Sequence, residues 1–433
     1  MNFEESVNYL YNLGYELSVK KFGLENTVKL LDKLGNPQNN FTKIQVAGTN
    51  GKGSTCAFLE AICVSAGIKT GLYTSPHLIS VTERIKINGA EISEEDFAKH
   101  ATKIKKVSEK LFESGELETV PTFFEQVTAI ALSVFVEERI EIAILETGIG
   151  GRFDATTATN AEIVAITPID FDHQDILGNT LAKIAAEKAA IIRSDTKVIL
   201  APQKKEAERV VLGKCREKGV EPIFATADFQ VKKDFLTFPM LFVTYKTLNN
   251  NYPNVLVSLA GRHQFENAAI AINIAETLRE FKFEISQNSI IAGLETAEHK
   301  GRLEFYKGIL FDGAHNVAGA KALREYLDEF VKRPITMIFG SMKDKDLSEI
   351  TGILFPLADK LILTSPDNPR SMKTADLMKF LPENFDKLKI YPTEDIEQAL
   401  KIAKNISCEN DLICVTGSLY LVGEAQKLLN NKS

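Results

Sequence analysis

Short apolar runs alternate with amphipathic helical patterns along most of the 433-residue chain. In the first part, a run such as residues 140–145 is apolar almost throughout, which is typical of parallel strands covered on both faces. The strands predicted on this basis are residues 43–47, 69–74, 140–146, 161–167 and 197–201. Between them, the spacing of apolar positions predicts helices, for example over residues 122–138 and 180–193.

The pattern changes twice in the rest of the chain. Residues 228–258 combine short apolar runs with Pro and Asn turns, which predicts a small antiparallel sheet, and helical patterns follow over 264–297. A second series of strands is predicted at residues 309–311, 335–339, 360–363, 389–391 and 412–415. Five strands suffice for an independent doubly wound domain. We therefore predict an α/β fold with a mostly parallel sheet domain over 1–297, a linker over 298–301 and a smaller Rossmann-like domain over 302–433.

Composition narrows the classes of function. The formal net charge is -7, and this argues against a nucleic-acid or anionic-membrane surface, where a basic stripe is expected. The sequence contains no run approaching the roughly 20 apolar residues of a membrane helix, and residues 1–5 lack the pattern of a secretion signal. The five cysteines are scattered, so we expect neither disulfides nor a cysteine-bound metal. The expected location is the reducing cytoplasm, and nothing in the sequence demands more than a monomer.

A glycine-rich segment lies between a predicted strand and a predicted helix that begins at Ser54. It consists of Gly48, Thr49, Asn50, Gly51, Lys52, Gly53 and Ser54. Glycines let the backbone turn its amides toward phosphate oxygens, a lysine meets the β- and γ-phosphates, and the helix N-terminus adds a positive dipole. The common phosphate loop has Ser or Thr directly after Gly-Lys, whereas Gly53 intervenes here. The alternative is a flexible turn, but the context favours binding of a nucleoside triphosphate.

The sequence of this loop, Gly-Thr-Asn-Gly-Lys-Gly-Ser, and eight later motifs resemble the Mur ligase superfamily, and more narrowly its folylpolyglutamate synthase and dihydrofolate synthase branch. The later motifs lie in order at residues 74–78, 83–89, 122–125, 146–156, 172–178, 187–189, 261–267 and 312–316. Thr157, Ala190 and Arg193 depart from the family pattern. The resemblance implies an enzyme that uses ATP to convert a folate-type carboxylate to an acyl phosphate and joins it to the amine of L-glutamate.

The resemblance also implies Mg²⁺, at two sites, with ligands Ser75, Glu146, His173 and Lys188. Glu146 ends a predicted strand before a glycine-rich turn, which is where α/β sheets present ligand groups. His173 alone would be a hydrogen-bonding loop residue, and Lys188 alone a solvated helix lysine. In the family, Lys188 would be carbamylated by CO₂ and so become a metal-binding anion. Lys52, Lys188 and His315 are the implied catalytic residues.

Residues near the predicted domain boundary would complete the nucleotide site. By resemblance, Asn267, Arg302 and Asp312 contact ATP, and His315 places phosphate or the incoming amino acid. The segment 312–316 is a strand-turn-helix sequence that can bind an anion at the helix N-terminus. Read without the family, Asp312 would be a local cap.

The acceptor requires an aromatic surface with polar contacts for its pterin ring. By resemblance the candidates are Arg84, Phe123, Phe124 and Glu125, although both phenylalanines also fit the core face of a helix. The loop before the last helix contains Ser418, which could hold the glutamate carboxylate or belong to a plain βα loop.

Two other functions compete with this interpretation. A ligase for a UDP-sugar peptide of the cell wall usually carries an additional N-terminal uridine-binding domain, and we expect none because the loop begins at Gly48. An ATP-hydrolysing binding or switch protein explains the loop but not the motifs at 146–154 and 312–316.

Overall fold

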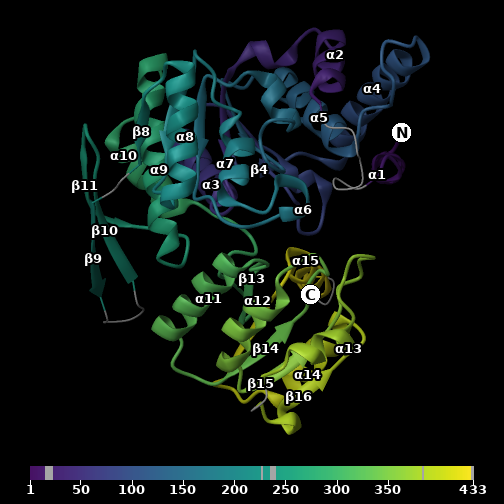
Figure 1. Ribbon diagram of the computed structural model, residues 1–433, viewed down its shortest axis with the longest axis vertical. Coiled ribbons are helices and arrows are strands. Elements are labelled where there is room, and N and C mark those ends of the chain that lie inside the picture. The colour runs from purple at the N-terminus through teal and green to yellow at the C-terminus, as the bar shows by residue number, and fades with distance from the viewer. Residues whose placement is uncertain (15–22, 226–227, 235–239, 383–384, 431–433) are drawn as a thin grey trace. The chain divides into compact units, whose positions relative to one another are not determined.

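The structure is a computed structural model that describes residues 1–14, 23–225, 228–234, 240–382 and 385–430. The chain forms two compact units. Unit 1 comprises Met1–Lys232, Leu241–Ser258 and Glu266–Ala297, and most of unit 2 is Glu298–Ser433, joined by Leu259–Phe265. Figure 1 shows that each unit is built of helices packed around a sheet, and this confirms the predicted α/β class.

The sheet of unit 1 has eight strands in the order β4-β3-β2-β5-β1-β6-β7-β8. Their bounds are β1 Thr42–Ala47, β2 Thr70–Tyr73, β3 Ile85–Ile87, β4 Ala90–Glu91, β5 Ile142–Glu146, β6 Ile163–Ile166, β7 Lys197–Leu200 and β8 Pro222–Phe224. The strands from β2 to β8 along this order are parallel, and β3 and β4 extend the edge antiparallel. Because β1, β5 and β6 are neighbours, the loops that follow them emerge side by side at one edge.

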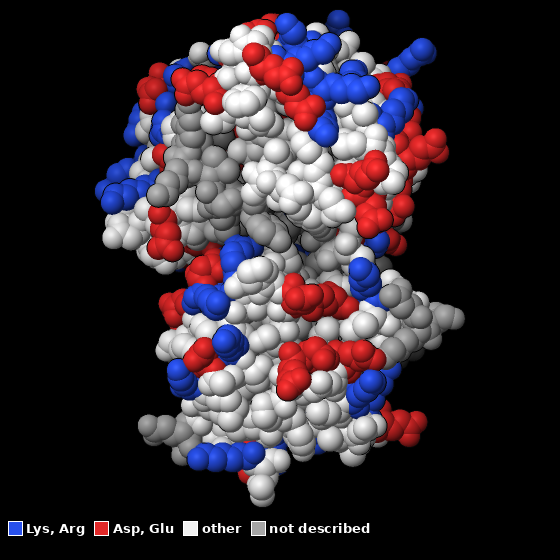
Figure 2. Space-filling view, turned by 90° about the vertical axis from the view of Figure 1, so that its right-hand side faces the viewer, with Lys and Arg blue, Asp and Glu red and all other residues white. Residues whose placement is uncertain are grey.

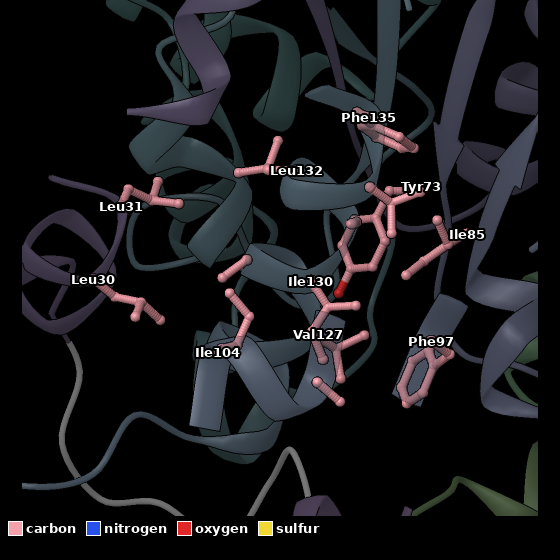
Figure 3. Close-up of a cluster of buried hydrophobic side chains, with 14 of the residues drawn as sticks. Leu30, Leu31, Tyr73, Ile85, Phe97, Ile104, Val127, Ile130, Leu132 and Phe135 are labelled. Atoms are coloured by element: carbon pink, nitrogen blue, oxygen red, sulfur yellow. The ribbon is translucent and has the colours of Figure 1, made fainter. Parts of the chain in front are cut away.

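Helices cover both faces of this sheet. They are α1 Phe3–Asn12, α2 Glu25–Lys33, α3 Lys52–Ser65, α4 Glu94–Glu113, α5 Phe123–Glu137, α6 Gln174–Leu177, α7 Leu181–Ala189, α8 Lys205–Lys218, α9 His263–Leu278 and α10 Gln287–Thr296. One buried cluster joins α1, α2, α4 and α5 to strand residues including Tyr73 and Leu145, and Figure 3 shows part of it. Ile142 and Ile144 alternate along β5 with Ala143 and Leu145 of this cluster, so they point to the opposite face of the sheet, where they are equally buried. Helix α3 contacts β1, β2 and β5.

Two helix boundaries differ from the sequence prediction for local reasons. Helix α3 begins at Lys52 instead of Ser54, because Gly51 with φ 87° occupies the N-cap position. The helical pattern over 264–297 is divided into α9 and α10, because Lys282 adopts a left-handed conformation and Ser286 caps α10. The predicted small sheet consists of β9 Asp228–Asp234, β10 Met240–Lys246 and β11 Asn251–Leu256, of which β10 and β11 pair antiparallel.

Unit 2 contains a six-stranded sheet in the order β12-β13-β17-β14-β15-β16. Its strands are β12 Glu304–Tyr306, β13 Ile309–Asp312, β14 Ile335–Phe339, β15 Lys360–Leu363, β16 Ile390–Pro392 and β17 Leu412–Thr416. The five predicted strands are parallel to one another, and β12, which was not predicted, adds an antiparallel edge.

The helices of unit 2 cover both faces of its sheet. They are α11 Val317–Phe330, α12 Leu347–Leu354, α13 Thr374–Leu377, α14 Ile396–Ile406 and α15 Leu419–Asn430. Helices α11 and α12 pack with Met337 and Phe339 in one buried cluster. Ile338 points to the opposite face and is fully buried, and α14 and α15 contact the strands. The sheet is therefore a covered parallel sheet that presents its loops at the strand ends.

Within the described ranges, we find no helix whose length and apolar character would suit a membrane span. On the face shown in Figure 2, Lys and Arg side chains are interspersed with Asp and Glu side chains.

Candidate active site

The loop between β1 and α3 turns at two glycines that have no room for a side chain. Gly48 has φ 152° and Gly51 has φ 87°. A Cβ at Gly48 would lie 1.8 Å from Thr167 Oγ1, and a Cβ at Gly51 would lie 2.2 Å from Asn267 Oδ1. The loop therefore fits closely between the end of β6 and helix α9, and the predicted nucleotide residue Asn267 is its direct neighbour.

The start of α3 is arranged to receive an anion. Gly51 caps the helix without a side-chain hydrogen bond, and the first turn contains no acidic residue. The loop is held by Thr49, whose N–H donates to Pro168 O at 3.0 Å and whose Oγ1 donates to Asp170 O at 3.0 Å. Amides at an uncapped helix N-terminus, in a backbone held rigid, form a binding site for phosphate oxygens.

Two lysines meet at the carbonyl of Gly48. Lys52 Nζ donates to Gly48 O and to Thr49 O, each at 3.2 Å, and Lys188 Nζ donates to Gly48 O at 2.6 Å. Lys188 is 5% exposed. Burial, and secondarily the charge of Lys52, lowers the pKa of Lys188 to about 7. The helix lysine of the sequence is thus a buried amine that is partly neutral near pH 7.

A carboxylate lies beside this loop on the neighbouring strand. Glu146 ends β5 and pairs in register with Val46 of β1, and it is 6% exposed. Its Oε2 accepts a hydrogen bond from the Ser75 amide at 3.1 Å. The structure thus brings together Ser75 and Glu146, two of the residues expected to bind metal.

His173, the third expected ligand, lies in the loop after β6. Its backbone is left-handed with φ 47°, and its amide donates to Asp172 Oδ1 at 2.9 Å. Its Nε2 is 3.8 Å from Asp172 Oδ2. Asp172 also acts electrostatically on Lys188, whose pKa it raises against the larger effect of burial. The carboxylate of Asp172, which the sequence analysis did not select, therefore connects the histidine loop with the buried lysine.

The glycine-rich turn after β5 is organised by a buried carboxylate. Asp154 Oδ2 accepts from the amides of Gly148 and Ile149 at 2.8 and 3.2 Å, and Oδ1 accepts from Thr156 N at 3.0 Å. Burial raises the pKa of Asp154 to about 6. A Cβ at Gly148 would lie 2.9 Å from the ring of Phe124, so this turn and the aromatic residue are in close contact.

The residues expected to bind the pterin ring form two neighbouring sets. The Arg84 guanidinium carbon lies 5.1 Å from the centroid of the Phe123 ring. Phe124 lies against Tyr73, with centroids 5.9 Å apart. Glu125 is a capping residue: its Oε2 accepts from Thr122 N at 2.8 Å and its Oε1 from the Thr27 hydroxyl at 3.0 Å.

Unit 2 brings Asp312, at the end of β13, close to Arg302, which lies just before the antiparallel partner strand β12. Asp312 is 8% exposed at the end of β13, and its carboxylate accepts from the amides of Ala314 at 2.9 Å and Leu303 at 3.0 Å. Arg302 Nη1 donates to Gly313 O at 3.3 Å. Burial raises the pKa of Asp312, and Arg302 opposes this shift.

His315 and Ser418 lie at the same edge of the unit 2 sheet. His315 Nδ1 is 2.8 Å from Gly313 O, and because a carbonyl only accepts, Nδ1 carries the proton and Nε2 is the acceptor of the neutral ring. Ser418 follows β17, the strand that pairs with β13, and its Oγ accepts from Tyr420 N at 3.1 Å at the start of α15. A Cβ at Gly313 would lie 2.3 Å from Leu419 Cδ2, so these two loops touch.

The sequence matches two domain profiles of one family. The profile described as "Mur ligase middle domain" matches residues 46–275, and "Mur ligase, glutamate ligase domain" matches residues 301–419. The chain belongs to the Mur ligase family. Within this family, its relatives are folylpolyglutamate and dihydrofolate synthases, which confirms the branch expected from the motifs.

Two curated relatives cover nearly the whole chain. The dihydrofolate synthase/folylpolyglutamate synthase of Bacillus subtilis (strain 168) is 34% identical over 422 residues, which are 94% of this chain and 95% of the relative. The folylpolyglutamate synthase of Lacticaseibacillus casei is 30% identical over 439 residues, which are 100% of each chain.

Solved structures of the same Mur ligase branch share the fold. E. coli FolC in complex with DHPP and ADP has a TM-score of 0.87 and 27% identity, covering 100% of this chain and 98% of that one. The bifunctional folylpolyglutamate synthase/dihydrofolate synthase from Yersinia pestis, complexed with AMPPNP and Mn ion, has a TM-score of 0.85 and 26% identity, covering 99% of this chain and 98% of that one.

The donors in unit 1 of this Mur ligase suit a hard divalent cation. No group of three or more His, Cys, Asp or Glu side chains in the described ranges is arranged as a metal cluster. Glu146 and Ser75 nevertheless offer oxygen donors next to the phosphate loop. Mg²⁺ is usually held by one or two protein oxygens together with phosphate oxygens and water, so this sparse set fits it.

Proposed function

We propose that this Mur ligase uses ATP to join L-glutamate to the carboxylate of a folate-type acceptor. The observation that carries the proposal is the convergence of the Lys52 and Lys188 amines on Gly48 O, beside Glu146 and the uncapped start of α3. Anionic phosphates need such a site, and relatives over almost the entire chain are named for this reaction.

The reaction requires activation of the acceptor, because a carboxylate is a poor acylating agent. One of its oxygens attacks the γ-phosphorus, an O–P bond forms, the bond to ADP breaks, and an acyl phosphate results. The glutamate amine then attacks the acyl carbon, phosphate leaves, and the nitrogen loses a proton. Lys52 and the amides of residues 51–54 stabilise the charge of the transferring phosphoryl group.

Divalent metal chemistry would support the first step. We propose Ser75, Glu146 and His173 as the residues that would hold Mg²⁺ at two sites, where it neutralises triphosphate charge. Asn267 beside Gly51, with Arg302 and Asp312 of unit 2, would bind the rest of ATP. The proposed assignment of roles is an ATPase domain over 1–297 and a ligase domain over 302–433, joined by 298–301.

We propose that Lys188 carries a carbamate in the active enzyme. The ammonium first loses one proton, and the neutral amine then attacks the carbon of CO₂, so that an N–C bond forms and a second proton is released. In total a cation becomes an anion. Burial favours this reaction because it lowers the pKa of Lys188 and so supplies the neutral amine. The anion would help to hold the second Mg²⁺.

The organic substrates would contact residues in both units. For the pterin ring we propose Phe123, Phe124, Arg84 and Glu125, the last through its position at the start of α5. His315 would accept the proton of the glutamate amine at Nε2, and Ser418 with the first amides of α15 would bind a glutamate carboxylate. Cytoplasmic location and a monomeric state remain predictions.

Phosphate release tests the proposal. Purified protein with ATP and Mg²⁺ is expected to release phosphate only when a pteroyl-type acid, dihydropteroate or tetrahydrofolate, and L-glutamate are both present. Equal release without either substrate would identify an ATP-hydrolysing switch instead. Release that depends on a UDP-sugar peptide in place of the folate would identify a cell-wall ligase.

A further inference from the structure

A chain of contacts links the N-terminal helix to the arginine at the proposed pterin site. Tyr11 of α1 stacks on Phe123 of α5, with ring centroids 5.5 Å apart and planes at 4°. The Tyr11 hydroxyl is 3.1 Å from His77 Nε2, and Arg84 Nε is 2.8 Å from His77 Nδ1. The Arg84 guanidinium in turn lies over the Phe123 ring. The four side chains come from α1, from α5 and from the segment between β2 and β3, and they form a closed circuit.

The chemistry of the donors fixes the direction of these hydrogen bonds. Arginine Nε is a donor only, so His77 Nδ1 accepts and the proton of the neutral ring is on Nε2, from which it is donated to the Tyr11 hydroxyl oxygen. Because the guanidinium is planar, a fixed Nε–H direction orients all of its N–H groups.

The loop that carries His77 is anchored on both sides by carboxylates. Glu146, beside the phosphate loop, accepts from Ser75 N at 3.1 Å. Glu83 accepts from Leu78 N, Ile79 N and Ser80 N, each at 2.7 Å. His77 therefore has a defined position relative to Glu146, and the side chain that orients Arg84 is built on the same loop as the proposed metal ligand Ser75.

We propose that Tyr11 and His77 are positioning residues for the acceptor: they hold Arg84 against Phe123 in the orientation that binds an acid carrying a conjugated bicyclic ring. This inference rests on the proposed function and extends it to two residues outside the expected site. Its consequence is that the N-terminal helix contributes to acceptor affinity, while ATP and glutamate binding are independent of it.

Variants of α1 and of His77 distinguish positioning of Arg84 from a general contribution to the stability of the fold. Tyr11→Phe keeps the ring stack and removes the hydroxyl. Tyr9→Phe is the matched control, because Tyr9 lies on the same helix and its hydroxyl contacts Gln126, outside the circuit. His77→Leu removes both hydrogen bonds, and His77→Gln restores an acceptor and a donor on one side chain.

The measurements are the KM values of the folate acceptor, ATP and glutamate, together with kcat. Tyr11→Phe is expected to raise the KM of the acceptor about three- to tenfold, the effect of one lost hydrogen bond, and His77→Leu at least about tenfold. The other KM values and kcat should change less than about twofold in Tyr11→Phe. Tyr9→Phe should leave every KM unchanged, and His77→Gln should recover part of the loss caused by His77→Leu.

Two results would overturn the inference. One is an unchanged acceptor KM in Tyr11→Phe and His77→Leu, and the other is an equal effect of Tyr9→Phe. The circuit itself is tested without any substrate, by a double-mutant cycle of unfolding free energies for Tyr11→Phe and His77→Leu, which should be non-additive. Non-additive stability in a protein that ligates no folate would mean that the proposed function fails while the circuit exists.

Discussion

Lys188 shows how far burial changes the chemistry of a single residue. Its amine donates a hydrogen bond to Gly48 O. The charge of Lys52 lowers the pKa of this amine, and the charge of Asp172 raises it. A charged ammonium in this place is unfavourable, so burial lowers the pKa of Lys188 from its ordinary value of 10.5 to about 7. The residue therefore has a measurable influence on the stability of the protein.

The sign of this influence follows from proton binding. Between pH 7 and pH 10.5, the unfolded chain keeps the Lys188 proton and the folded protein releases it, so the stability contributed by this group rises with pH. In CO₂-free buffer, Lys188→Met should be more stable than the natural protein at pH 6, on the order of a few kcal/mol. The difference should shrink as pH rises toward 10, as urea unfolding at several pH values would show.

Lys183, an exposed lysine of the same helix, provides the control. Lys183→Met should change the free energy of unfolding by the same amount at every pH. If the free energy of unfolding depends on pH in the same way in the natural protein and in Lys188→Met, the assignment of Lys188 as a buried amine with a lowered pKa is contradicted.

Crystals grown with bicarbonate and Mg²⁺ test the carbamate on Lys188. Electron density beyond Nζ is expected, and a bare amine would contradict the proposal.

At the scale of elements, the phosphate loop depends on glycines for two separate reasons. Gly51 has a positive φ, and a Cβ there would collide with Asn267. Gly67 has φ 76° after the end of α3, but a Cβ there would meet nothing within 4 Å. A side chain is therefore conformationally unfavourable at both positions, but only at Gly51 would it also collide with another residue.

This pair gives a matched test of the loop. Both Gly51→Ala and Gly67→Ala should lower the free energy of unfolding by about 1 kcal/mol, because alanine is strained at positive φ. Gly51→Ala alone should also weaken ATP binding at least about tenfold, since the loop must move away from α9. Calorimetry with a non-hydrolysable ATP analogue measures this, and equal affinity in the two variants would contradict the assigned loop.

The elements that the sequence predicted best are those with strong apolar periodicity. Except for the short, partly exposed strand β8, which was not predicted, the parallel strands of both sheets and helix α5 were predicted to within a few residues, because buried strands are apolar almost throughout. Strands β3 and β4 were not predicted, since they are short and partly exposed at the edge of the sheet. The start of α3 was placed two residues late because Gly51, and not a capping side chain, begins the helix.

The candidate site was predictable where the chemistry is local in sequence. The glycines and Lys52 were recognised from the sequence of the loop, and Glu146 from its place at the end of a predicted strand. The burial of Lys188 and the contact of Tyr11 with His77 arise from packing between distant segments, which no local pattern encodes. Glu125 illustrates the converse: it was predicted only as a residue of the pterin site, although its spacing from Thr122 is the local sequence pattern of the capping box that the structure shows.

At the scale of the whole molecule, membership of the Mur ligase family connects the two units with one reaction. Unit 1 contains the phosphate loop with its lysines and Glu146, and unit 2 contains Asp312, His315 and Ser418 at the edge of a second parallel sheet. Each set lies where loops follow parallel strands, which is the general position of ligand sites in α/β folds. The central claim is that the chain spends ATP to form an amide bond.

The most direct test is the mass of the organic product. Purified protein is incubated with ATP, Mg²⁺ and isotopically labelled L-glutamate, with dihydropteroate or tetrahydrofolate in separate reactions, and the products are analysed by mass spectrometry. The account predicts that at least one acceptor gains a labelled glutamyl residue. It also predicts that Lys52→Ala lowers this rate by about a thousandfold or more while keeping the fold, as loss of a group that stabilises transition-state charge does. ATP consumption with neither acceptor gaining a glutamyl residue, or near-normal turnover in Lys52→Ala, would contradict it.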